Sequence, residues 1–140
     1  MPREWTWVLE TIRRILLTGD EAEFVRTLGR HLKRERFLLE EKCDYGAARR
    51  RIEDSRRSPF DLIVMVGTVP TPGMYEFLDW VKKVHPQTSV LLLSGIGFDQ
   101  RAAETMRPDM DGHGQQPITP KEMIALIRRI DRNRRRISRR

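Results

Sequence analysis

Few residues of this sequence stand where they could do chemistry. Asp20, Ser94 and Gln116 each close a segment that could be a strand, and they supply one carboxylate, one hydroxyl and one amide. A magnesium site for phosphoryl chemistry needs several oxygen ligands, carboxylates above all. No acidic residue lies between Asp61 and Glu76 to add one. The sequence offers no nucleophile–base pair and no cluster of metal ligands, so we expect no enzyme activity.

The positive charge is concentrated at the C-terminus. Residues 128–140 contain eight arginines and one aspartate, a net +7 that equals the net charge of the whole chain. Such a segment can bind the phosphates of nucleic acid or an anionic membrane surface. It has no interleaved aromatic residues and no helix-turn-helix pattern, so a solvated tail or a linker is an equal alternative. The candidate phosphate contacts are Arg134, Arg135, Arg136, Arg139 and Arg140.

Short apolar runs alternate with amphipathic stretches, as strands alternate with helices in a parallel α/β sheet. The predicted strands are 15–17, 37–39, 62–66 and 90–93, with a weak fifth at 112–115. The predicted helices begin near residue 21, span 47–52, 77–81 and 102–106, and begin again at residue 119.

The last two elements differ most in the strength of their signals. Gly112–Gln115 has no aliphatic residue to bury, so it is expected to be short and at a sheet edge. The final helix has an N-cap in Thr119, proline at the next position and Glu122 to close a capping box.

The length of the chain fits one domain with a core of its own. The single cysteine, Cys43, excludes an internal disulfide, and no signal pattern or membrane-spanning run is present, so we expect a cytoplasmic protein. We divide the chain into an N-terminal extension (1–12), a domain (13–131) and a basic tail (132–140). Trp5 and Trp7 in the extension pack on the domain or contact a partner.

Four features follow one another along the sequence with definite spacing. Asp61–Val66 is an apolar segment, Pro70 follows it by four residues, and Ser94 follows it by 28. Gln116 and Pro117 stand next to each other 22 residues after Ser94. In this order they resemble the acceptor strand, loop proline, switch Ser/Thr and Lys-Pro pair of CheY-like receiver domains of response regulators. The resemblance covers about residues 13–131. It implies a three-layer, flavodoxin-like fold with a five-stranded parallel sheet of order 2-1-3-4-5 and five helices.

The departures from that family decide the functional prediction. In the family, two acidic residues and the acceptor aspartate hold magnesium. Here Gly19 and Asp20 replace the acidic pair, Val66 stands at the acceptor position and Gln116 replaces the lysine; Ser94 alone is kept. The resemblance therefore implies a degenerate phosphorylation pocket with no catalytic residue, no magnesium site and no cofactor.

The remaining polar residues have structural interpretations too. Asp20 is a candidate helix cap, and Ser94 a strand-end hydroxyl bound to backbone. His113 takes the place of the family's switch aromatic, where it either titrates or is simply a half-exposed polar residue. By resemblance, Pro70 and Pro117 are the loop and cis-proline candidates, and the bond before Pro117 is expected to be cis.

The resemblance implies a two-component signalling module of pseudo-receiver type, which acts by protein contact without phosphate. The family's contact face would here include Arg101, Lys121, Ala125 and Arg128, on the fourth and fifth helices. A homodimer is a further option. The alternative function is a nucleic-acid-associated regulator that uses the arginine-rich tail.

Overall fold

The computed structural model describes residues 12–19, 22–54, 60–67, 71–95, 101, 104 and 110–138, with backbone alone for residues 135–138. Its strands are β1 (Arg14–Gly19), β2 (Leu38–Lys42), β3 (Leu62–Gly67), β4 (Ser89–Ser94) and β5 (Gly112–Gln115). Its helices are α2 (Ala22–Arg34), α3 (Tyr45–Glu53), α4 (Pro72–Val84) and α6 (Pro120–Ser138). The five strands form one parallel sheet in the order β2-β1-β3-β4-β5, as predicted.

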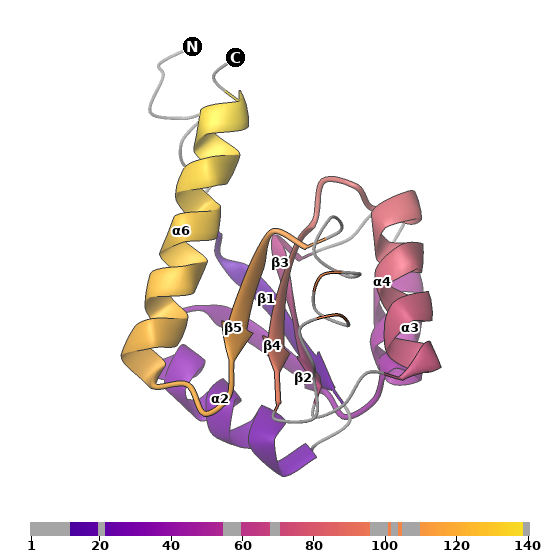
Figure 1. Cartoon of the computed structure of the whole chain (residues 1–140), viewed down its shortest axis with the longest axis horizontal. Coiled ribbons are helices and arrows are strands. Elements are labelled where there is room, and N and C mark those ends of the chain that lie inside the picture. Colours follow the sequence, from indigo (N-terminus) through magenta and orange to yellow (C-terminus); the bar gives the residue numbers. More distant parts are fainter. Residues whose placement is uncertain are drawn as a thin grey trace.

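Two apolar clusters lie on opposite faces of this sheet. The sheet is the middle of three layers, with helices on either side. Helices α2 and α6 cover one face, and α3 and α4 cover the other (Figure 1). The alternation of side chains along β3 shows the division, since Val64 and Val66 belong to the α2/α6 cluster while Ile63 and Met65 belong to the α3/α4 cluster. All residues of β3 and β4 are buried, which explains their continuous apolar sequences.

The edge strand β2 is charged and is tied to α3 by an ion pair. The guanidinium of Arg51 donates to both carboxylate oxygens of Glu40, at 2.8 and 2.9 Å. This hydrogen bond raises the pKa of Arg51 above its usual value. A charged edge discourages pairing with a strand of another molecule.

Two of the four residues of the opposite edge strand, β5, are glycines, and the packing of α6 explains why. A Cβ atom on Gly114 would lie 2.8 Å from Leu126 and 2.9 Å from Leu93, and one on Gly112 would lie 2.8 Å from Ile130. The absence of these two side chains lets α6 pack directly on the backbone of β5. Helix α6 thus supplies the aliphatic groups that the strand lacks.

Helix α6 begins at the predicted capping box. The backbone N–H of Glu122 donates to the Thr119 hydroxyl at 3.1 Å, and the Thr119 N–H donates back to the Glu122 carboxylate at 3.4 Å. Residues 132–138 continue the helix, although the sequence pattern predicts a domain that ends at residue 131 and a tail at 132–140. Arginine favours helix, and no glycine or proline interrupts the run.

Polar contacts fasten the far end of α6 to the start of the sheet. Arg134 donates to the backbone carbonyl of Asp61 and, at 3.2 Å, to the hydroxyl of Ser89. Asp131 is buried and accepts from the backbone N–H of Ile12 at 3.3 Å. Arg134, a predicted phosphate contact in the basic tail, is therefore also a structural anchor of α6.

Several predictions fall outside the described residues. These are Asp20, Pro70, the Trp5 and Trp7 segment, and Arg139 and Arg140. Of the predicted fourth helix, Arg101 and Glu104 are described, and both are helical. No helix in the described part of the chain is long and apolar enough to span a membrane.

Gly114→Val should destabilise the fold because its side chain must enter the space that Leu126 and Leu93 occupy. We expect a loss of about 1–3 kcal/mol in the free energy of unfolding, measured by urea denaturation. Gly73→Ala is the matched control, because nothing lies within 4 Å of a Cβ atom there and alanine favours helix. Equal stability of Gly114→Val and the native chain would contradict the close packing of α6 on β5.

Candidate functional site

The carboxyl ends of the parallel strands bring the predicted pocket residues to one edge of the sheet, where ligands bind in such folds. Gly19 pairs with Val66 across β1 and β3, and Ser94 pairs with Gly67 across β3 and β4. Gln116 follows directly after β5, whose last residue pairs with Ser94. Four of the five predicted pocket residues therefore meet at this edge, and Asp20 lies outside the described residues.

Val66 is part of the core. Its side chain is 1% exposed and belongs to the apolar cluster shared with α2 and α6. Its polar backbone is also engaged, since its carbonyl accepts from the Tyr45 hydroxyl at 3.5 Å. The position that corresponds to the acceptor thus has neither a side-chain oxygen nor solvent access.

Gly19 lies so close to β3 that it has no room for a side chain. A Cβ atom on Gly19 would clash with the backbone carbonyl oxygen of Val66. Because this oxygen belongs to the sheet, it cannot swing aside as the end of a flexible side chain could. The packing of β1 against β3 therefore suits a glycine at position 19 and leaves no space for a carboxylate side chain.

Ser94 is bound to His113, and this contact is not among those predicted from the sequence. The Ser94 Oγ and His113 Nε2 atoms are 2.7 Å apart, and Ser94 also lies 3.5 Å from the carbonyl oxygen of Gly114. The serine is 1% exposed, so both contacts are largely shielded from water. The signal in the sequence is that both stand at switch positions of the resembled family, on strands that pair.

Gln116 folds back onto the sheet. Its side-chain Nε2 donates to the backbone carbonyl of Leu93 at 3.2 Å, and its backbone N–H donates to the carbonyl of Ser94 at 2.8 Å. The peptide bond between Gln116 and Pro117 is cis, which confirms the prediction. The Gln116 amide, at the position that corresponds to the lysine, thus binds the backbone of β4.

The chemistry left at this edge is limited. Among the described residues, no group of three or more His, Cys, Asp or Glu side chains could hold a metal ion. The four described residues at the predicted pocket positions, a glycine, a valine, a serine and a glutamine, carry no positive charge that could pair with a phosphoryl group. The serine and the glutamine already bind groups of the protein itself.

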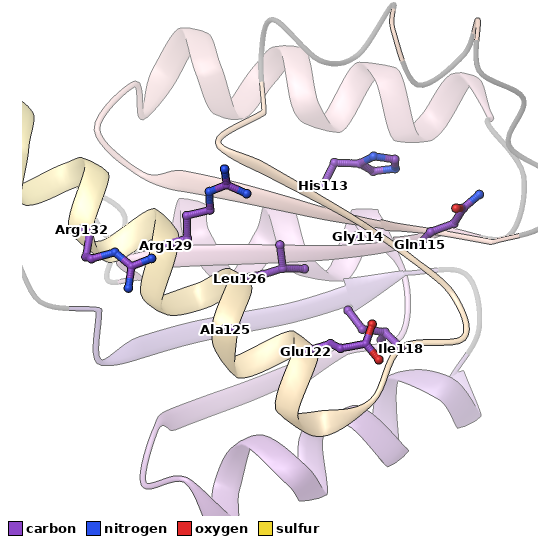
Figure 2. Close-up of a pocket in the computed structure, with 9 residues that line it drawn as sticks. All are labelled: His113, Gly114, Gln115, Ile118, Glu122, Ala125, Leu126, Arg129 and Arg132. Carbon is purple, nitrogen blue, oxygen red and sulfur yellow. The ribbon is translucent and has the colours of Figure 1, made fainter.

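A second feature is an open groove of about 780 Å³ between β5 and α6. Ile118 and Leu126, both half-buried, give it an apolar part. Figure 2 shows Glu122 at one end and Arg129 and Arg132 towards the other. The full lining comprises His113, Gly114, Gln115, Ile118, Glu122, Ala125, Leu126, Arg129 and Arg132.

The predicted contact face lies next to this groove. Lys121, Ala125 and Arg128 are all exposed on α6, and Ala125 lines the groove itself. Arg101 is exposed as well, on the helical residues before β5. Three of the four predicted face residues therefore share one helix.

Comparisons with known proteins agree on the architecture. No family model and no curated relative matches the sequence. Among solved structures, a response regulator receiver domain protein from Clostridium thermocellum has a TM-score of 0.77 at 17% identity, covering 90% of this chain and 99% of that one. A CheY-like receiver domain protein from Methanospirillum hungatei has a TM-score of 0.77 at 16% identity, covering 90% and 98%.

A third similar structure has a different description. It is an adenylate cyclase from Rhodopirellula baltica, with a TM-score of 0.76 at 21% identity, covering 91% of this chain and 93% of that one. Identities this low show the fold and leave the activity open. The strand order, the three layers and these likenesses together show that the chain has the fold of CheY-like receiver domains.

Proposed function

We propose that this chain is a pseudo-receiver: a two-component signalling module that acts by protein contact and accepts no phosphate. The observation that carries the proposal is the burial of Val66 in the core at the position that corresponds to the acceptor. Phosphoryl transfer to such a domain needs a carboxylate oxygen held near a magnesium ion. A valine that is 1% exposed supplies no such oxygen.

The surrounding polar groups support the same proposal. Ser94 is bound to His113, and Gln116 is bound to the backbone of β4. A phosphoryl group would have to break these contacts without gaining a lysine or a set of metal-binding carboxylates. The module would therefore keep one arrangement at this edge, and its signal would come from its presence or abundance and not from phosphorylation.

The groove between β5 and α6 is our candidate for the contact surface. It combines an apolar part with charged residues at its ends, as protein interfaces combine an apolar centre with a polar rim. Ala125 lies on its wall and keeps the helix surface low enough for a partner to approach. We propose a signalling protein as the partner, in a cytoplasmic setting, with neither catalysis nor a cofactor involved; a second copy of this chain is the other candidate.

Acetyl phosphate with magnesium should leave the protein unmodified, because no acceptor carboxylate is present at Val66. Intact mass spectrometry checks this, and amide chemical shifts should stay unchanged on adding beryllofluoride. Val66→Asp is the matched variant, and it too should stay unmodified, because the lysine position is still Gln116. A stoichiometric phosphoryl adduct on the native chain would refute the proposal.

Introducing a second carboxylate at position 19 should lower the stability of the fold and should not create a metal site. Gly19→Asp places a side chain against the Val66 carbonyl, and we expect it to cost about 1–3 kcal/mol of unfolding free energy. Gly73→Asp is the control, because it has open space in the first turn of α4, where an acidic residue is favourable. Urea denaturation of the two variants should separate them; equal stabilities would show that β1 and β3 can move apart.

Ala125→Glu should abolish capture of the signalling partner by placing a bulky charge in the groove wall. Affinity capture with the native chain should give the same partner with and without acetyl phosphate. Ala47→Glu, in the first turn of α3 on the opposite layer, is the control that should retain it. Capture that depends on acetyl phosphate, or that survives Ala125→Glu but not Ala47→Glu, would argue against this surface.

A further inference from the structure

Arginines occupy a row of positions on the side of α6 that faces away from the sheet. At 3.6 residues per turn, positions 128, 129, 132, 135 and 136 fall within about 120° around the helix axis. We call these five positions the arginine stripe. The buried side chains Met123, Ile127 and Ile130 occupy the opposite side of the helix. Arg128, Arg129 and Arg132 are exposed to solvent, and the five positions together span about 12 Å of helix length.

The stripe is held on a fixed support. Arg134 and Asp131 lie outside it and turn to the sheet, where they bind Asp61, Ser89 and Ile12. Helix α6 remains helical to Ser138 and extends beyond the strands in Figure 1. This end of the helix lies at the amino ends of β3 and β4, opposite the edge with the degenerate pocket.

Three arginines of the stripe, Arg128, Arg129 and Arg132, form no ion pair with another described residue. All three residues are exposed. The segment 128–140 carries the entire net charge of the chain, so the rest of the domain is neutral in sum. The protein thus has one strongly basic end and no compensating acidic patch beside it in the sequence.

The chemistry of the stripe selects one class of partner. Residues 111–140 contain no Phe, Tyr or Trp, the side chains on which single-stranded bases mainly stack. A helix that lies in a membrane surface needs a free apolar face, and α6 has placed its apolar face on the sheet. A regular row of guanidinium groups instead matches the closely spaced phosphates of a duplex. We propose that the arginine stripe binds double-stranded nucleic acid through its phosphate backbone, without reading sequence, and independently of the proposed signalling role.

Fluorescence anisotropy with a short labelled DNA duplex of mixed sequence tests this on the full chain. Binding should weaken steeply between about 50 and 200 mM salt, with a slope of log K against log salt of about −4.5 if five arginines each displace one counterion. A duplex of scrambled sequence should bind equally well. The same duplex made of RNA shares the phosphate chemistry, and its affinity relative to DNA decides which of the two is preferred.

The decisive variant replaces Arg128, Arg129 and Arg132 together with glutamine. We expect at least about a tenfold loss of affinity at low salt and a slope smaller in magnitude by about 2.7. The matched control, Arg26→Gln with Arg50→Gln and Lys83→Gln, removes the same charge from exposed positions on α2, α3 and α4. It should retain the native slope, and thermal unfolding should show both triple variants to be folded.

Three outcomes would overturn the proposal. Equal losses in the two triple variants would assign the effect to net charge and not to the stripe. Tighter binding of single strands than of duplex would contradict the choice of ligand. Competition by polyglutamate as effective, per charge, as unlabelled duplex would indicate an acidic protein as the partner.

Discussion

The close approach of α6 to the glycine strand β5 is the constraint on which the rest of this structure depends. Gly112 and Gly114 have no side chains, so Leu126 and Ile130 can fill the space above the strand. That contact closes the sheet at an edge which has no aliphatic residues of its own. It also sets where the wall of the groove runs and which side of α6 remains outside. The groove and the arginine stripe are two consequences of one packing arrangement.

The described pocket residues at the carboxyl edge are packed or bonded within the protein. Val66 is part of the core, and the Gly19 backbone lies against its carbonyl oxygen. Ser94 and Gln116 bind groups of the protein itself. These contacts support the proposal that the domain accepts no phosphate, since each occupies space that a metal ion and a phosphoryl group would need. The pocket is better described as a packed end of the sheet than as an incomplete active site.

The two ends of the domain therefore differ in character. The described pocket residues at the carboxyl edge are apolar or internally hydrogen-bonded, whereas the opposite end carries arginines of α6. Surface charges can attract charged groups of an approaching partner. Buried polar groups that bind one another cannot do so. A domain of this kind is suited to binding through its surfaces. This supports the proposed role as a contact module.

The order of elements, the continuous apolar strands β3 and β4 and the capping box at Thr119 could be predicted from the sequence alone, as could the absence of a side-chain oxygen at Val66. These depend on local patterns and on residue types, which need no partner to be recognised. Tertiary structure alone decided three further points: the reason for glycines in β5, the bond between Ser94 and His113, and the use of Arg134 as an anchor. Each joins residues that are distant in the sequence, and a row of arginines looks the same whether one of them turns to the sheet or none does. For the same reason composition alone does not show that the last helix continues to Ser138, where tertiary contacts of Asp131 and Arg134 hold it on the sheet.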